Sequence, residues 1–150
     1  MKVEFGLGWI KSGKGWQKNF KSQAALSLFE DYLQRLSHFS NISAGKIPEN
    51  TELKSKTVWI CDTSKPAKTL TSEELAKKLS QLLNSGTREL RILIGGPDGF
   101  TSDFITRIQP ELRWSFGPLT FPHELAAVVA AEQLYRAWTI LHHLPYHSGH

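Results

Sequence analysis

The sequence predicts a single α/β domain, residues 1–150, whose mostly parallel sheet carries helices on both faces. Three observations support this fold class. Strand-like and helix-like segments alternate along the chain, which is typical of parallel sheets. Two of the strand-like segments, Val58–Cys61 and Leu90–Ile94, are short and largely apolar, as expected for strands buried on both faces. With 40% hydrophobic and 21% charged residues, a chain of 150 residues can bury a core, and its one cysteine excludes an intrachain disulfide.

The first half of the chain contains two clear elements. Apolar residues alternate over 2–8 and predict a first strand, and residues 11–15 form a flexible basic loop. From Ala25 to Leu36, apolar residues recur at the spacing of an amphipathic helix. Residues 41–57 are irregular and are expected to hold at most one short strand.

The second half is better marked. Thr71 and Glu74 have the spacing of a capping box, so a helix should begin there and end at Gly86. A third helix is expected from Thr101 or Ser102 to about Gln109. A short strand over 113–116 and a loop over 117–122 follow, and the last helix should extend from His123 to about Leu144, where Pro145 stops it.

Other features exclude several classes of protein. The longest unbroken apolar run, 125–131, is seven residues long, far short of the ~20 that a membrane span requires. The N-terminus lacks the pattern of a secretory signal, so a cytoplasmic location is expected. Histidines gather near the C-terminus, but Pro145 interrupts them and no cysteine is close by, so no metal site is expected.

The net charge of +4 is unevenly distributed. Residues 1–78 hold 13 Lys and Arg against eight Asp and Glu, a balance of +5, whereas residues 79–150 have five against six. In the N-terminal part, lysines alternate with Trp16 and Phe20, a combination that suits single-stranded or looped RNA. The alternative is that Trp16 and Phe20 pack in the core beneath a solvated fringe of lysines, and the sequence leaves both open.

Three predicted strands end in unusual sequences: Cys61–Asp62, Gly95–Gly99 and Gly117–Thr120. Ligands of open α/β sheets bind beyond the carboxyl ends of strands, and glycines let the backbone approach a ligand closely. A small-molecule pocket built largely from backbone is therefore one interpretation, and ordinary turn chemistry is the other. No dinucleotide or P-loop motif is present. Cys61 is not expected to act as a nucleophile, because it sits in an apolar strand end beside Asp62.

The predicted last helix places Glu132 and Arg136 four residues apart among apolar neighbours. If exposed, such a pair contributes only ~0.3–0.5 kcal/mol. If it is buried at an interface or beside a ligand, it has a specific role. The sequence does not decide between these alternatives.

An ordered series of motifs resembles one known family. The series comprises Ile94–Gly99, Trp114–Phe116, Leu119–His123, Glu132–Trp138 and Pro145–His147. It resembles the ribosomal RNA large subunit methyltransferase H family, which belongs to the SPOUT superfamily. The resemblance implies an α/β knot, in which the C-terminal segment threads through a loop to form a trefoil knot.

The resemblance also implies an activity and its partners. Family members are homodimers that bind S-adenosylmethionine and methylate N3 of a pseudouridine in large-subunit (23S) ribosomal RNA. By matching positions, the implied cofactor-binding residues are Cys61, Gly95, Gly96, Phe116, Gly117, Pro118, Leu119, Thr120 and Phe121. The implied catalytic residues are His123, Arg136 and His147, and the expected RNA-binding residues are Lys11, Lys14, Lys18 and Tyr146.

Methylation of an imino nitrogen requires that its proton leave, so a general base or an anion-stabilising group is expected. Our hypothesis is that His123 or His147 assists proton removal while Arg136 orients the RNA or stabilises charge. Ala127 and Ser148 replace an arginine and a lysine that the family usually carries. These departures leave open two alternatives: a methyltransferase for another RNA, and a diverged, non-catalytic protein that binds RNA or the ribosome.

Overall fold

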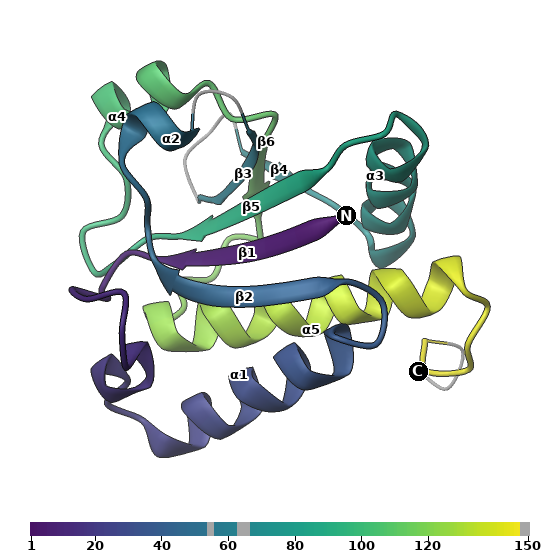
Figure 1. Ribbon diagram of the computed structural model, residues 1–150, viewed down its shortest axis with the longest axis horizontal. Helices are drawn as coiled ribbons and strands as arrows, with labels where there is room; N and C mark the ends of the chain where they lie inside the picture. The colour runs from purple at the N-terminus through teal and green to yellow at the C-terminus, as the bar shows by residue number, and fades with distance from the viewer. Residues whose placement is uncertain (54–55, 63–66, 148–150) are drawn as a thin grey trace.

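A parallel β-sheet forms the centre of the molecule, as the sequence predicts (Figure 1). The computed structural model describes residues 1–53, 56–62 and 67–147. Over these residues the sheet has six strands in the order β2-β1-β5-β3-β6-β4, and every pairing is parallel. The strands are β1 Lys2–Leu7, β2 Asn41–Lys46, β3 Thr57–Cys61, β4 Lys68–Thr69, β5 Glu89–Ile94 and β6 Leu112–Ser115.

Helices cover both faces of the sheet, and this part of the predicted fold class is confirmed. The helices are α1 Gln23–Leu36, α2 Asn50–Leu53, α3 Ser72–Asn84, α4 Ser102–Ile108 and α5 His123–Leu141, with a 3₁₀ turn, η1, at Trp16–Asn19. In Figure 1, α5 lies along one face of the sheet between α1 and α3, and α2 and α4 lie on the opposite face. The strand order does not establish whether the C-terminal segment passes through a loop of the chain, so the expected knot stays a prediction. In the described part of the chain, no helix is long and apolar enough to cross a membrane.

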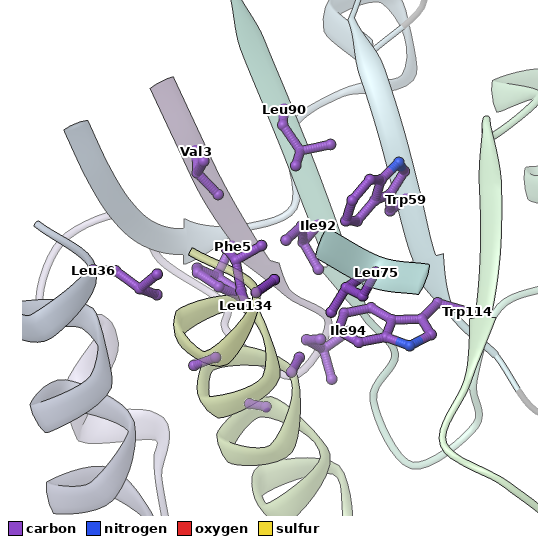
Figure 2. Packing of buried hydrophobic residues seen from close by; sticks show 14 of the residues in the cluster. Val3, Phe5, Leu36, Trp59, Leu75, Leu90, Ile92, Ile94, Trp114 and Leu134 are labelled. Carbon is purple, nitrogen blue, oxygen red and sulfur yellow. The ribbon is translucent and has the colours of Figure 1, made fainter. Parts of the chain in front are cut away.

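The larger hydrophobic core lies between the sheet and the layer of α1, α5 and α3. Figure 2 shows Phe5 of β1 close to Leu134 of α5, with Leu75 of α3 near Ile94 of β5. All four side chains are almost completely buried. Each such side chain contributes roughly 1.5–3 kcal/mol on leaving water, so this layer fixes α5 against the sheet. A smaller core beneath α2 and α4 includes Leu93.

The starts of α1, α3 and α4 follow the capping rules. The Thr71 hydroxyl accepts a hydrogen bond from the backbone N–H of Glu74 at 3.1 Å, which confirms the predicted start of α3. Thr101 caps α4 in the same way, and Ser22 caps α1. These hydroxyls satisfy backbone donors that the first turn of a helix leaves unpaired.

The end of α5 differs from the prediction. The helix ends at Leu141, not near Leu144. His143 adopts a left-handed conformation with φ 55°, and the N–H of Leu144 donates to the carbonyl of Thr139 at 2.9 Å. This is the geometry of a C-terminal helix cap, so the chain leaves the helix before Pro145 can act.

Other differences are small. Between residue 41 and the start of β3 at Thr57, the described residues hold the strand β2, as expected, and also the one-turn helix α2. The two-residue strand β4 and the η1 turn have no counterpart in the prediction. Both are too short to show a periodic pattern. Strand β6 begins and ends one residue before its predicted position.

Glu124 connects the beginnings of α1 and α5. Its two carboxylate oxygens accept hydrogen bonds from the backbone N–H groups of Lys21 and Ser22, each at 2.9 Å. The Glu124 side chain is buried, and the carboxylate lies at the N-terminus of α1, where a negative charge is favourable. This contact fixes the chain that precedes α1, which includes the basic loop, relative to α5.

We predict that Glu124→Ala lowers the free energy of unfolding by about 2–4 kcal/mol, because two backbone N–H groups lose a charged acceptor. Urea denaturation measures the change. Glu30→Ala, on the exposed surface of α1, is the matched control and should change stability by less than about 0.5 kcal/mol. Equal stability of the two variants would contradict the role assigned to Glu124.

Candidate functional site

The carboxyl ends of four neighbouring strands meet at one edge of the sheet. The register aligns Leu7 of β1 with Ile94 of β5, Ile94 with Cys61 of β3, and Cys61 with Trp114 of β6. Beyond these ends lies a cavity of about 570 Å³, which we call the strand-end cavity. The ends of β3, β5 and β6, the turn after β5, the loop after β6 and the first turn of α5 line it. A volume of this size is typical of small-molecule sites.

One wall of the strand-end cavity is backbone from the glycine turn after β5. The N–H of Gly8 donates to the carbonyl of Ile94 at 2.8 Å, and the two chains then pass very close together. A Cβ atom on Gly8 would lie 2.6 Å from the nitrogen of Gly96, which real Cβ atoms do not tolerate. Within the turn, Gly99 has φ 68° and its N–H donates to the carbonyl of Gly96. Here glycine is required for both close approach and conformation.

Another part of the lining is aromatic. The ring of Phe116 packs edge-on against Trp114 with ring centroids 4.9 Å apart, and Phe121 lies 6.3 Å from Phe116. Between them the loop turns at Gly117, whose φ is 103° and whose N–H is held by the Ser115 hydroxyl at 3.1 Å. The cavity therefore offers both flat apolar surface and exposed backbone groups.

The structure brings together most of the residues expected to bind a cofactor. Seven of the nine line the strand-end cavity: Cys61, Gly95, Gly96, Phe116, Leu119, Thr120 and Phe121. Gly117 faces a neighbouring cavity instead, and Pro118 belongs to the same loop without lining the strand-end cavity. Asp62, Phe100 and Trp114 also line it.

The ionisable groups of the strand-end cavity differ in what they can do. Burial, reinforced by the charge of Asp62, raises the pKa of the Cys61 thiol well above its usual range, so the thiol stays protonated. The Asp62 carboxylate accepts two hydrogen bonds from the Arg113 guanidinium, at 2.5 and 3.0 Å. The third ionisable group is His123. Its ring packs on Trp9 with ring centroids 4.6 Å apart, and its Nε2 atom lies 3.8 Å from the Glu124 carboxylate. A histidine is well suited to move a proton near neutral pH.

A second cavity adjoins the first. It has a volume of about 390 Å³ and lies between β6, the beginning of α3 and the middle of α5; we call it the α3–α5 cavity. Trp114 and Phe116 line both cavities. On its far side, the Ser72 hydroxyl donates to the Gln133 side-chain carbonyl at 2.8 Å. This pair could not be predicted from local sequence patterns, because 61 residues separate its members.

The other two predicted catalytic residues lie together, away from His123. Arg136 contacts Glu132 at 2.9 Å and the Nδ1 atom of His147 at 3.2 Å, and His147 Nε2 lies 2.7 Å from Glu73. We call these residues, with Tyr146, the C-terminal cluster. Arg136 follows His123 by 13 positions on α5, which is roughly 20 Å along the helix. One chain therefore does not place Arg136 or His147 in the strand-end cavity.

Packing in the C-terminal cluster answers the question that the sequence left open for Glu132 and Arg136. Both side chains are less than one-fifth exposed, so the pair is not an ordinary surface ion pair. Burial lowers the pKa of Arg136, but the hydrogen bond to Glu132 outweighs this effect, so the pKa is raised overall. The guanidinium also lies 4.8 Å above the Tyr146 ring. Burial, together with a contact to Tyr32, raises the pKa of Tyr146, which stays protonated.

The N-terminal basic segment separates into two parts. Lys11, Lys14 and Lys18 are exposed. Phe20 is buried, and Trp16 packs against the core 5.7 Å from another aromatic ring. The structure thus favours the alternative in which Trp16 and Phe20 belong to the core and only the lysines face solvent. Ser148 lies outside the described residues, and no cluster of potential metal ligands occurs in the described part of the chain.

Comparison with known proteins gives a consistent result. A family model described as "Predicted SPOUT methyltransferase" matches residues 16–147. The ribosomal RNA large subunit methyltransferase H of Dichelobacter nodosus is 33% identical over 145 residues, covering 94% of this chain and 91% of that protein. The protein of the same name from Alkalilimnicola ehrlichii is 52% identical over 75 residues, covering 50% and 46%.

A solved structure is also similar. Legionella pneumophila Lpg2936, in complex with the bound cofactor SAM, aligns with TM-score 0.46 and 12% identity, covering 92% of this chain and 66% of that chain.

The close approach of Gly8 to Gly96 generates a prediction. Gly8→Ala should lower the free energy of unfolding by about 1–3 kcal/mol, because the new methyl group would press the two backbones apart. Gly45→Ala, near the end of the neighbouring strand β2, is the control, since its Cβ would meet nothing within 4 Å. Urea denaturation of both variants measures the difference, and equal stabilities would show that the contact is not tight.

Proposed function

The chain belongs to the SPOUT methyltransferase family, and from this premise we propose that it methylates large-subunit ribosomal RNA with S-adenosylmethionine as methyl donor. The observation that carries the proposal is the strand-end cavity. Seven residues implied by the family resemblance to bind the donor, far apart in the sequence, line this one cavity. The relatives' names supply the RNA class.

The strand-end cavity fits this cofactor in shape and chemistry. Phe116 and Phe121 provide flat apolar faces against which an adenine ring can pack. The backbone of Gly95 and Gly96 can approach a ligand without side chains in between, and its N–H and C=O groups can recognise polar edges. Leu119 is 68% exposed, so the loop that carries it borders the opening rather than the core.

We assign the proton transfer to His123. S-adenosylmethionine supplies a methyl group that is already activated by a positively charged sulfur. At N3 of a pseudouridine, the proposed acceptor, the N–H bond breaks and an N–CH₃ bond forms, so one proton must be accepted in each turnover. His123 lines the strand-end cavity, and its packing against Trp9 holds the ring in place. Among the described residues, no other histidine lines this cavity.

Lys11, Lys14 and Lys18 are proposed to bind the RNA backbone. The basic loop directly follows Gly8 and Trp9, which contact the glycine turn and His123. Lys11 and Lys14 lie in this loop and Lys18 lies in the η1 turn after it, so all three belong to the segment between the glycine contact and α1. Phosphate contacts of this type bind RNA without reading its sequence and weaken as salt concentration rises.

We further propose that the active form is a homodimer in which the C-terminal cluster of one copy reaches the strand-end cavity of the other. The solvent side of α5 leaves Leu125 41% exposed, and Val129 and Glu132 follow it at helical spacing. Val129 lies midway between His123 and Arg136. If two copies of α5 cross antiparallel about a twofold axis at Val129, His123 of each copy faces the partner's Arg136. Arg136 would then stabilise negative charge on the acceptor base.

The cofactor assignment predicts that the protein binds S-adenosylmethionine and that Phe121→Ala weakens binding about 10–100-fold, through loss of an aromatic wall. Isothermal titration calorimetry measures both. Leu144→Ala removes an exposed apolar side chain outside the cavity and should retain wild-type affinity. No binding by the wild-type protein would favour the alternative of a non-catalytic RNA-binding protein, and full binding by Phe121→Ala would exclude the strand-end cavity.

The homodimer predicts complementation between inactive chains. His123→Ala and Arg136→Gln should each abolish methyl transfer, and dimers mixed from both should regain about a quarter of wild-type activity, because half the dimers contain one intact composite site. Methyl transfer to ribosomal RNA before and after subunit mixing is the measurement. If both residues acted within one chain, mixing would restore nothing, and the composite site would be wrong.

A further inference from the structure

Glu73, in the first turn of α3, contacts the C-terminal segment of the chain. Its carboxylate oxygen lies 2.7 Å from the Nε2 atom of His147, 74 residues further along the sequence. The hydrogen bond to His147 lowers the pKa of the Glu73 carboxyl below its usual range, so the group stays ionised and can only accept hydrogen bonds. The Glu73 side chain is 65% exposed, so this contact adds little to the stability of the fold. What the contact determines is the state of the His147 ring.

The two neighbours of His147 determine which ring nitrogen carries the proton. Arg136 Nη1 lies 3.2 Å from Nδ1, and a guanidinium nitrogen can only donate. Nδ1 must therefore accept this hydrogen bond, which leaves the proton of the neutral ring on Nε2. Nε2 then donates to the Glu73 carboxylate. Glu73 thus favours the one neutral tautomer in which His147 can accept a hydrogen bond from Arg136.

The Arg136 guanidinium is oriented by contacts to different nitrogens. Glu132 contacts its Nε and Nη2 atoms, each at 2.9 Å, while His147 contacts Nη1. Each of the two terminal nitrogens carries two hydrogens, so one hydrogen on each remains for a ligand after these contacts. Glu132 and His147 together fix the direction in which this pair of donors points.

We propose that Glu73 and His147 are positioning residues for methyl transfer: through the Nε2–H tautomer of His147, Glu73 fixes the Arg136 guanidinium in the orientation that the composite site requires. This inference rests on the proposed function, because it assumes that Arg136 acts in the strand-end cavity of a second copy. Neither Glu73 nor His147 needs to touch the RNA or the methyl donor. Both nitrogens of His147 are occupied by these contacts, so proton removal stays with His123.

Substitution of Glu73 separates this role from a binding or structural one. Glu73→Ala removes the acceptor of the Nε2 proton, whereas Glu73→Gln keeps an oxygen that can accept it. Glu74→Ala removes the same charge from the same helical turn and is the matched control. Methyl transfer from S-adenosylmethionine to ribosomes from cells lacking the gene gives kcat and KM, and calorimetry gives the affinity for S-adenosylmethionine.

We expect kcat to fall about 10-fold in Glu73→Ala and no more than about threefold in Glu73→Gln, because a misdirected guanidinium stabilises the transition state less well. The KM for RNA and the affinity for S-adenosylmethionine should stay within about twofold of wild type. Glu74→Ala should behave as wild type. Wild-type kcat in Glu73→Ala, an equal loss in Glu74→Ala, or a loss confined to KM or donor affinity would overturn the assignment.

Subunit mixing shows which half of the composite site Glu73 serves. Dimers mixed from Glu73→Ala and His123→Ala should rise to about a quarter of wild-type activity, because half of them contain one site with every residue intact. Dimers mixed from Glu73→Ala and Arg136→Gln should gain nothing, since both changes fall in the same C-terminal cluster. The reverse pattern, or no gain in either mixture, would overturn the positioning role even if the wild-type protein methylates RNA. Absence of methyl transfer by the wild-type protein would instead refute the proposed function.

Discussion

The close contact between the backbones of Gly8 and Gly96 is the constraint on which the site depends. Parallel pairing brings the carboxyl ends of β1, β5, β3 and β6 to one edge of the sheet, but the ends would not enclose a cavity without tight turns beyond them. Glycine at position 8 lets the chain leaving β1 pass directly against the turn leaving β5, because a Cβ atom there would lie 2.6 Å from the nitrogen of Gly96. Beyond Gly8, the same chain continues into the basic loop of residues 11–15.

Helix α5 links the parts of the site in a fixed order. Its first turn carries His123 at the strand-end cavity, its middle lines the α3–α5 cavity through Val129 and Gln133, and Arg136 anchors the C-terminal cluster. Glu124 holds the helix to the start of α1, and the core under Leu134 holds it to the sheet. The strand-end cavity, the α3–α5 cavity and the C-terminal cluster are therefore held in fixed positions along one helix.

Strong local patterns could be read from the sequence, whereas contacts between distant segments could not. The helix capped by Thr71 and the apolar strand β5 were predicted because their signals lie within a few residues. The predicted end of α5 was wrong because the left-handed conformation of His143 ends the helix before the chain reaches Pro145. Residues of the strand-end cavity were predictable from strand-end composition and family resemblance. The pairing of Ser72 with Gln133 was not, since only folding brings them together.

Locating the transferred methyl group on the RNA tests both the proposed methyltransferase activity and its proposed acceptor. The protein would be incubated with isotopically labelled S-adenosylmethionine and large ribosomal subunits from cells lacking the gene, and the RNA would be digested and analysed by mass spectrometry. If the proposed function is correct, one nucleotide carries the label: a pseudouridine with the methyl group on N3. Label on a different nucleotide would contradict the proposed acceptor, and unlabelled RNA would contradict the proposed methyltransferase activity itself.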